Sequence, residues 1–354
     1  QGRGAGQQVL DASAQDAPLK ILVGFPAGGS IDTIARSLAA ELTTLLKRPV
    51  VVENRPGAGG QIAAVALKGA APDGNTLFLT NSHTVSMIPL TVRTPGFEPA
   101  KDFAPVSMVA MSPDVLGVNV KLVGEKGGLR EFIEWAKANP GKASVGVPAP
   151  ASAPDFAVKM MGKAFRTDLN AVSYRGDGPV VQDLIAGQIA AGIGSVGAMS
   201  QYVKAGQVRL IAVNLPARME RMPEVPTYSE QGMKGYESGN FVALFAPAGT
   251  PVDFVRRVNA AVGTVTKSPD FAQRLATLGI TPVHSSPEGL AATVQEVNHA
   301  LAEMVKAADF KMQCPRRRRT PGDADDRTCP PPPRAAHRAP RRADRRLPVG
   351  SAVS

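Results

Sequence analysis

Cysteine is nearly absent from this 354-residue chain: there are two, Cys314 and Cys329, and both lie close to the carboxyl end. The preceding residues therefore offer no metal site of the CxxC kind and no cysteine nucleophile. No grouping of His, Asp and Glu along the chain has metal-ligand spacing either. We predict neither a metal nor a cofactor.

Aromatic residues and long apolar runs are also scarce. Aromatics make up only 5% of the chain, which disfavours a pocket built on stacking, although Phe25 and Phe241 could each face a cleft. No uninterrupted apolar run approaches the roughly 18 residues that are needed to span a bilayer. The sequence is therefore not that of a membrane channel or carrier.

Positive charge is concentrated at one end of the chain. Of the net charge of +10, residues 314–354 supply +7, from eleven Arg against four Asp, and this leaves +3 for residues 1–313. Nucleic-acid binding requires cations clustered on a folded surface, so no nucleic-acid partner is predicted. The Arg/Pro-rich segment 312–354 cannot bury enough apolar surface to order itself, and we predict a disordered tail. A basic tail that meets an anionic surface is the alternative.

The first residues lack both the basic and the apolar region of a signal peptide. Ala12-Ser13-Ala14 nevertheless has the small residues that precede a cleavage site. Either the leader is absent from this chain or the match is chance. Residues 1–18 are predicted to form a disordered N-terminal extension.

Short apolar or β-branched runs alternate with amphipathic segments from residue 20 to residue 247. The expected strands are 20–24, 50–53, 76–80, 115–119, 143–147, 171–174, 189–193, 208–214 and 241–246. The expected helices include 30–47, 60–69 and 128–138, and residues 250–308 are almost purely helical in pattern. This alternation predicts an α/β protein with mostly parallel sheets.

Two lobes are expected, because the chain leaves the first sheet near Ser112-Pro113 and returns near residues 239–241. Lobe 1 is discontinuous, with residues 19–113 and 240–311, and lobe 2 is formed by residues 114–239. Ligands of open parallel sheets sit beyond the carboxyl ends of the strands. We therefore expect a ligand cleft between the lobes.

A glycine-rich turn, GFPAGGS at residues 24–30, joins the first strand to the first helix. It has the glycine spacing of a Walker A loop, but Ser30 stands where the lysine should be, and G-x-G-x-x-G is missing. The unpaired N–H groups and the dipole of a helix N-terminus bind a carboxylate as readily as a phosphate. Gly28 and Gly29 let a ligand approach closely, whereas Asp32 is expected to satisfy neighbouring N–H groups. A tight turn without a ligand is the alternative.

Other helix entries carry glycine, hydroxyl or amide groups and could converge on the same cleft. They are residues 56–60, 80–84, 150–152 and 174–178. Arg175, in the last of them, is either a bidentate carboxylate clamp or a solvated loop residue.

Catalytic interpretations have less support. Among the four histidines only His83 lies on an expected cleft loop, and Ser195 sits in a GIGSVG sequence that misses G-x-S-x-G. We predict that the chain is not an enzyme. A hydrolase that uses Ser82 or Ser195 with His83 is the less favoured alternative, and a sensor that presents its ligand to a signalling partner is another.

Several segments together resemble one protein family, both in their residues and in their order along the chain. They are GFPAGGSIDTIAR, RPVVVENRPGAGGQIAAVALKGAAPDGNTLFLTNS, KDFAPVSMVAMSP, SYRGDGPVVQDLIAGQI, VKAGQVRLIAV and PEVPTYSEQGMKGYESGNFVALFAPAGTP. From about Leu19 to about Phe310 the chain resembles the substrate-binding proteins of tripartite tricarboxylate transporters, the Bug family of extracytoplasmic solute receptors.

The resemblance implies a two-lobed periplasmic-binding-protein fold of type II-like architecture that closes over a small, usually carboxylated solute. It also implies a periplasmic location and delivery to the membrane subunits of a secondary transporter, without chemistry on the ligand. A monomer is expected. The ligand-binding residues that the resemblance implies are Phe25, Pro26, Ala27, Gly28, Gly29, Thr80, Asn81, Ser82, Ala151, Ser152, Gly176, Gly194 and Ser195.

Two departures from the family pattern bear on the ligand. Many relatives carry an Asp where Gly194 stands, so its absence makes an α-amino acid less favoured. The stretch before Ser152 reads VPAPAS, which is stiffer than the Gly-rich form of relatives. Aliphatic di- or tricarboxylates, aromatic carboxylates and neutral amides all stay open as ligands.

Overall fold

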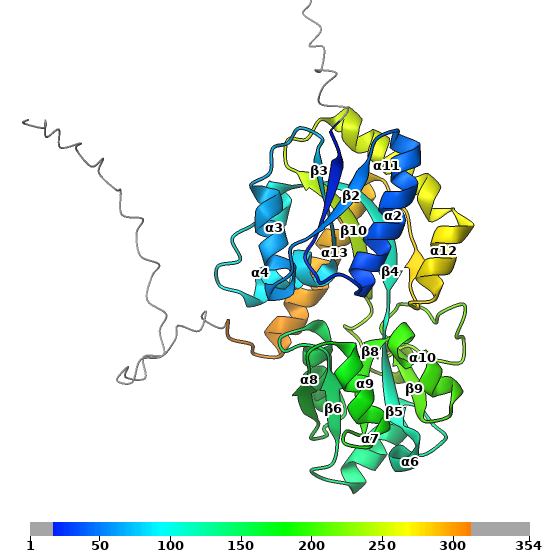
Figure 1. Ribbon diagram of the computed structural model, residues 1–354. Coiled ribbons are helices and arrows are strands. Elements are labelled where there is room, and N and C mark those ends of the chain that lie inside the picture. The colour runs from blue at the N-terminus through cyan, green and yellow to red at the C-terminus, as the bar shows by residue number, and fades with distance from the viewer. Residues whose placement is uncertain (1–16, 313–354) are drawn as a thin grey trace, which may run out of the picture. The chain divides into compact units, whose positions relative to one another are not determined.

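The computed structural model describes residues 17–312. The predictions made for residues 1–16 and 313–354 lie outside them. The described part of the chain is an α/β fold with two sheets, as the alternating pattern predicted (Figure 1).

The first sheet has the strand order β11-β4-β10-β3-β1-β2. Its strands are β1 (Leu19–Val23), β2 (Val50–Asn54), β3 (Thr76–Asn81), β4 (Phe103–Ser112), β10 (Asn240–Pro247) and β11 (Thr281–Pro282). β1 runs parallel to β2 and β3, whereas β10 is antiparallel to β3 and β4, and β11 is antiparallel to β4.

The second sheet has the order β7-β6-β8-β5-β9. Its strands are β5 (Asp114–Asn119), β6 (Ser144–Val147), β7 (Asn170–Ser173), β8 (Ala191–Ser195) and β9 (Val208–Val213). β6 is parallel to β7 and β8, and β5 is antiparallel to β8 and β9.

The expectation of mostly parallel sheets was wrong, and the reason lies in how the chain crosses between them. Only Pro113 separates β4 from β5, so one nearly continuous run of strand passes from the first sheet to the second (Figure 1). β5 enters where β8 ends, since Asp114 pairs with Ser195. A strand that enters at the carboxyl edge must run against its neighbours.

Helices cover both faces of the first sheet (Figure 1). On one side lie α2 (Ser30–Leu46), α11 (Val252–Thr266) and α12 (Pro269–Ala276), and on the other α3 (Gln61–Lys68), α4 (Ile88–Thr91) and α13 (Pro287–Ala307). Ile34, Leu38 and Leu42 of α2 are fully buried, because their spacing puts them on one face of the helix. Burial on both faces explains the unbroken apolar run Ile21-Leu22-Val23 in β1.

The second sheet carries its own helices. They are α6 (Val120–Val123), α7 (Leu129–Ala138), α8 (Ala153–Ala164), α9 (Asp177–Ile185) and α10 (Val196–Lys204). The last helix, α13, contacts both β4 and α8, and beyond its end the ring of Phe310 lies edge-on to Phe156 at 5.3 Å. Residues 287–310, which were assigned to lobe 1, therefore also pack on an element of the second sheet.

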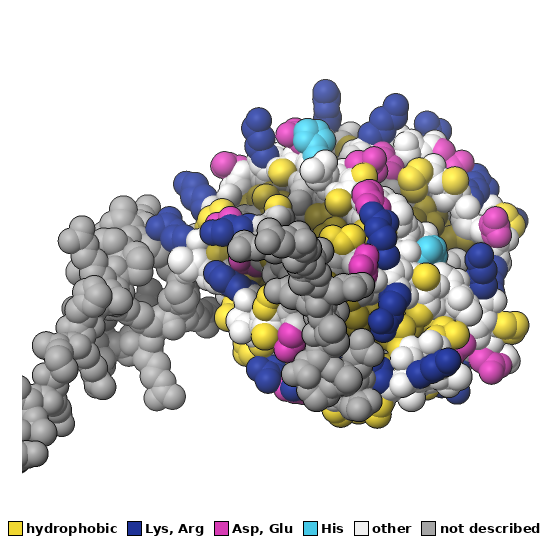
Figure 2. All heavy atoms as spheres, turned by 90° about the horizontal axis from the view of Figure 1, so that it is seen from above, with side chains coloured by type: hydrophobic (Ala, Val, Ile, Leu, Met, Phe, Trp, Pro, Cys, Tyr) yellow, Lys and Arg dark blue, Asp and Glu magenta, His cyan; other side chains and the backbone are white. Residues whose placement is uncertain are grey.

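Within residues 17–312 no helix combines the length and the apolar character that crossing a membrane would require. Figure 2 shows Lys and Arg side chains interspersed with Asp and Glu on the face that it views. That face presents mixed charge and not a cluster of cations.

Candidate functional site

The loops that follow β1, β2 and β3 pack directly on one another. A Cβ atom on Gly24 would lie 2.7 Å from the Cα of Gly60, and one on Gly60 would lie 2.3 Å from Oγ1 of Thr84. Thr84 in turn donates its hydroxyl hydrogen to the carbonyl of Gly59 at 2.7 Å. Glycine is therefore needed at both positions for close approach, and three of the predicted helix entries converge at this edge of the first sheet.

The loop after β1 leaves the N-terminus of α2 open. Residues 26–30 are exposed, and Gly29 caps the helix without any side-chain hydrogen bond. Gly28 has φ +89°, and a Cβ placed there would meet nothing within 4 Å. The first N–H groups of α2 and the positive end of its dipole are thus free to meet an anion.

Asp32 holds this loop in shape. Its carboxylate, with 2% of the residue exposed, accepts the N–H of Gly28 at 2.9 Å, Nε of Arg36 at 3.0 Å and the amide of Asn54 at 2.9 Å. The expectation that Asp32 satisfies neighbouring N–H groups is confirmed. Burial alone would raise the pKa of Asp32, but the Gly28 N–H, Arg36 and Asn54 outweigh it and keep that pKa below its usual value.

Replacing Asp32 by alanine is expected to lower the free energy of unfolding by about 1–3 kcal/mol, because the Gly28 N–H and the Asn54 amide lose their acceptor. Urea denaturation at pH 7 measures the loss. The difference between wild type and variant should shrink as the pH falls below about 4 and through the lowered pKa of Asp32, since the contribution of its charge is fully present only above the pKa of an unfolded aspartate. Asp253→Ala, at an exposed position in the first turn of α11, is the control and should change stability by less than about 0.5 kcal/mol. Equal losses in the two variants would contradict the anchoring role.

The loops after β6, β7 and β8 are linked in a similar way. The N–H of Gly176 donates to the carbonyl of Pro148 at 2.8 Å, and the N–H of Ser195 donates to Oδ2 of Asp177 at 3.1 Å. α9 begins after Gly176, which has φ +99° and open space around a Cβ, and no side chain caps this helix. The second sheet therefore also presents an open helix N-terminus.

Strand register places the two groups of loops on either side of the crossing. Asn81, at the end of β3, pairs with Val242 of β10. Asn240 lies two residues earlier on β10, about 7 Å along the strand, and its side chain is close enough to Asp114 to lower the pKa of that carboxyl. Asp114 pairs with Ser195 at the end of β8. The loops of the two sheets therefore flank one short stretch of polar residues.

Two carboxylates at the crossing were missed by the sequence reasoning. Asp114 is buried, and burial together with the charge of Asp177 raises the pKa of Asp114 to about 7, against the lowering effects of Asn240 and Tyr236. Oδ1 of Asp177 would lie 3.3 Å from a Cβ on Gly194. An acidic group thus stands beside Gly194 although that residue has no side chain. The only signal in the sequence was the Asp within the SYRGDGP segment.

Some of the predicted ligand-binding residues face the interior. Thr80 is fully buried, and its hydroxyl has no partner within residues 17–312. Ser82 is 2% exposed, and Ser152 caps α8 while its hydroxyl donates to the carbonyl of Ala149 at 2.6 Å. Ala151, just before it, adopts φ +52°. The predicted residues that retain accessible surface are Phe25 to Gly29, Asn81, Ala151, Gly176 and Ser195, and Gly194 is buried.

The geometry does not assemble a nucleophile and a base. Within residues 17–312 no hydrogen bond joins His83 to Ser82 or to Ser195, and Oγ of Ser195 accepts the N–H of Ala198 at 3.3 Å. Burial lowers the pKa of His83, whose ring packs against Gly59. A serine hydrolase needs its nucleophile within hydrogen-bond reach of the base.

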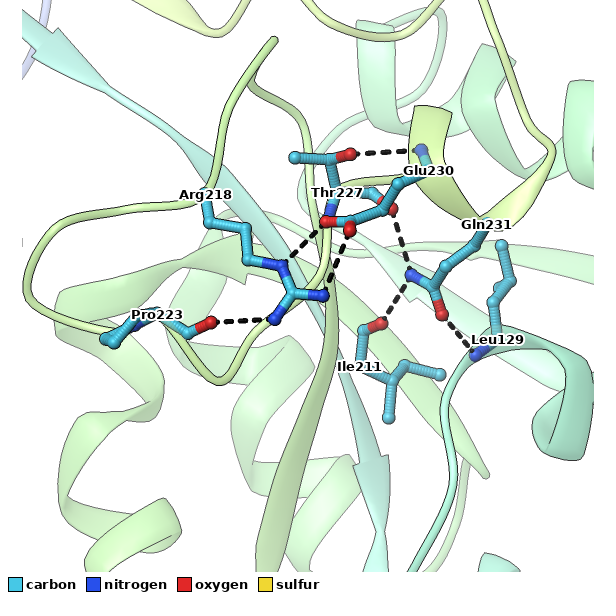
Figure 3. A network of polar contacts seen from close by, with 7 residues as sticks. All are labelled: Leu129, Ile211, Arg218, Pro223, Thr227, Glu230 and Gln231. Carbon is cyan, nitrogen blue, oxygen red and sulfur yellow. Dashed lines mark hydrogen bonds and ion pairs between the residues drawn. The ribbon is translucent and has the colours of Figure 1, made fainter.

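A cavity of about 840 Å³ lies between α10, residues 215–224 and the end of α12 with β11, and its wall includes Pro113 at the crossing and Val196, the residue after Ser195. None of the predicted ligand-binding residues lines it, and its walls are mainly apolar. Figure 3 shows what fixes one wall: Arg218 forms two bonds to the Glu230 carboxylate, at 2.8 and 2.9 Å, and a third to the carbonyl of Pro223. Arg218 and the Thr227 N–H lower the pKa of Glu230 to about 2. This network fixes the loop of residues 218–230. The residues at the open N-termini of α2 and α9 do not line the cavity.

This chain is similar to known proteins in both sequence and structure. Residues 34–310 match the family described as tripartite tricarboxylate transporter family receptor. Rpa4515 of R. palustris, solved with adipate, is similar with 28% identity and a TM-score of 0.73, over 83% of this chain and 97% of that one. MatC of Rhodopseudomonas palustris, with bound malate, shows 30% identity and a TM-score of 0.69, over 82% and 99%. The periplasmic binding protein BugD shows 30% identity and a TM-score of 0.71, over 84% and 99%. The periplasmic-binding-protein fold expected from the sequence is confirmed.

Proposed function

The chain belongs to the tripartite tricarboxylate transporter receptor family, and from this premise we propose that it captures a small carboxylated solute between its two groups of loops. It is an extracytoplasmic solute-binding receptor by family. Two proteins of the same fold are solved with dicarboxylates, adipate and malate. We extend the same ligand class to this chain.

The observation that carries the proposal is the open N-terminus of α2. Its glycine-rich approach is exposed, no side chain caps it, and Asp32 fixes the loop from behind. α9 offers a second uncapped N-terminus on the other sheet. Two such ends, one on each side of the crossing, suit a ligand with an anionic group that both sheets can reach.

Closure of the two lobes over the ligand follows from this arrangement. A ligand that contacts both groups of loops gains all of its contacts only when the lobes approach, and this difference in affinity drives closure. We propose that the closed form, as a monomer in the periplasm, delivers the solute unchanged to the membrane subunits of the transporter. The ligand-presenting sensor stays the alternative, and recovery of unmodified ligand separates both from a hydrolase.

The second group of loops also contains an acidic hydrogen-bond acceptor, the carboxylate of Asp177. Its Oδ1 lies beside Gly194, so a hydroxyl or ammonium group has an acidic partner there. We therefore include hydroxy acids and amino acids with the dicarboxylates in the ligand panel. This revises the expectation that Gly194 alone disfavours an α-amino acid.

A thermal-shift screen of the carboxylate panel tests the proposal. A ligand that binds only the folded protein adds roughly 2.7 kcal/mol at a hundredfold its Kd. Gly29→Phe is expected to weaken the binding of any hit at least tenfold, because the new side chain covers the approach to the α2 N-terminus. Gly29 has φ −75°, and the only atom near a Cβ there is the Pro26 carbonyl oxygen at 3.5 Å, so the variant should fold. Gly29→Ala is the matched control and should bind nearly as wild type. Two results would refute a carboxylate site at this helix. One is a protein that unfolds cooperatively but is stabilised by no carboxylate, and the other is a hit whose affinity is the same in Gly29→Phe as in the wild type.

A further inference from the structure

The parts of the chain that carry the two sheets also touch each other away from the chain crossings. Gly197, in the first turn of α10, lies against the turn of Leu278 and Gly279 that joins α12 to β11. A Cβ on Gly197 would overlap the Leu278 carbonyl group, with its carbon 2.6 Å away, and a Cβ on Gly279 would lie 2.7 Å from the nitrogen of Gly197. Backbone therefore meets backbone here, which only glycine permits. We call this the glycine contact.

The two crossings of the chain lie side by side and have the form of a hinge. Asn214 joins them, because its N–H donates to the carbonyl of Asp114 at 3.1 Å and its carbonyl accepts the N–H of Gly239 at 3.0 Å. β4, which leads into the first crossing, and β10, which follows the second, are neighbours in the first sheet. Hinges consist of a few residues at the ends of such elements, so the first sheet can tilt against the second about this pair of strands.

Strand order places the glycine contact and the candidate carboxylate site on opposite sides of this hinge. β11 borders β4 on one side, whereas β3 and then β1 lie beyond β10 on the other. Gly279 stands two residues before Thr281 of β11, which pairs with Met111 near the end of β4. The glycine contact is thus roughly 5 Å from the hinge strands, one strand spacing, and the loop after β1 is roughly 10 Å away. A small separation at the contact becomes a larger approach at that loop.

The surroundings of the glycine contact leave room for such a tilt. The cavity of about 840 Å³ lies between the same two parts of the chain, and Val196 and Gly279 belong to its wall. On this side the two parts are therefore held apart around the cavity and meet at the glycine contact. α13 also contacts α8, but Phe156 and Phe310 meet there through side chains, which can adjust. The backbone atoms of the glycine contact cannot.

We propose that the glycine contact is a stop that limits how far the candidate carboxylate site can open. Tilting the first sheet toward the cavity opens that site, and the backbone of Gly197 and Gly279 ends the movement. Closure over a ligand moves the sheets the other way and relieves the contact. The consequence for affinity rests on the proposed function, because the width of the open form sets the free energy that closure over a ligand requires.

Two variants thicken the stop, one from each side. Gly197→Ala adds a methyl group within α10, and Gly279→Asn adds a side chain at φ +69°, a conformation that asparagine tolerates. Gly69→Ala is the control for the first, because Gly69 is exposed at the end of α3 and nothing lies closer than 3.7 Å to a Cβ there. Gly206→Asn is the control for the second, since Gly206 has φ +73° and open space around a Cβ.

The width of the open form is measured without ligand. Spin labels on Arg55→Cys, in the loop after β2, and on Gln182→Cys, in α9, report the distance between the two parts by double electron–electron resonance. The full chain is used, with Cys314 and Cys329 replaced by serine. We expect a shorter mean distance in both thickened variants and the wild-type distance in both controls. A wild-type or longer distance in either thickened variant that folds overturns the proposal.

Titration of the unlabelled variants with adipate and with malate measures the consequence for affinity. The thickened variants should bind whichever acid the wild type binds about threefold more tightly, and the controls should stay within about twofold of wild type, because a narrower open form needs less free energy to close. Shorter distances with unchanged or weaker affinity would overturn the link between the stop and affinity. If no dicarboxylate binds the wild type, the proposed function fails, while the distances still decide whether the stop exists.

Discussion

Gly24→Ala is expected to lower the free energy of unfolding by about 3 kcal/mol, although it adds a single methyl group. The new Cβ would lie 2.7 Å from the Cα of Gly60 and 3.3 Å from the Cβ of Ala63. Its main obstacle is backbone, which cannot rotate away as a side chain can, so the loops after β1 and β2 must separate. Overpacking of this kind typically costs 1–3 kcal/mol.

Gly29→Ala provides the comparison from within the same loop. There the nearest atom to a Cβ is the Pro26 carbonyl oxygen at 3.5 Å, an ordinary contact. We expect its stability to stay within about 0.5 kcal/mol of wild type, the range of surface substitutions. Guanidinium denaturation of both variants measures the difference. If both lost the same amount, the contact between the first two loops would not be what requires glycine at position 24.

The first half of the fold was readable from local pattern. The runs at 20–24, 50–53 and 76–80 match β1, β2 and β3 to within a residue at each end, because each is bounded by turn residues and the first two are followed by an amphipathic helix. β4 was not predicted as a strand. It is a ten-residue strand, FAPVSMVAMS, with Pro105 in its sequence and buried residues on both faces, so it shows neither alternation nor clear ends.

Sheet direction was not readable, because it depends on which edge a strand enters. The sequence located the crossing near Ser112-Pro113, but not that β5 would enter beside the end of β8. The short run VLGVN from Val115 to Asn119 carries no signal of its direction in the sheet. Direction is a property of the pairing partner, and in β8 the partner residues lie from 73 (Val118 with Ala191) to 81 (Asp114 with Ser195) positions further along the chain.

Within the candidate site, too, local features could be predicted from the sequence and long-range neighbours could not. Gly28, Gly29 and Asp32 act within one turn of chain, so their roles followed from the local motif. Asp114 and Asp177 become neighbours only through the pairing of β5 with β8 and the start of α9. No spacing in the sequence joins them.

Asp114→Asn is expected to change how stability depends on pH. The pKa of Asp114 is raised to about 7 from the value of 3.8 of a free side chain, chiefly by burial and then by the charge of Asp177. The folded protein therefore binds a proton that the unfolded chain has released, and the wild type loses stability as the pH rises from about 4 to about 7. At 1.36 kcal/mol per pKa unit, the loss reaches up to about 4 kcal/mol.

The asparagine variant lacks this titration but keeps an oxygen that can accept from Tyr236, whose hydroxyl lies 3.2 Å from Oδ2 in the wild type. Urea denaturation from pH 4 to pH 8.5 should therefore show the variant near wild type at the acid end and more stable by up to about 4 kcal/mol above pH 7. Asp177→Asn keeps Asp114 but removes the neighbouring charge, so it should move the fall in stability to lower pH without abolishing it. Parallel pH profiles for wild type and Asp114→Asn would contradict a buried, proton-binding carboxyl at the crossing. Because Asp114 lies between the two groups of loops, a confirmed profile would also mean that a cationic group brought there by a ligand favours the charged form of this carboxyl.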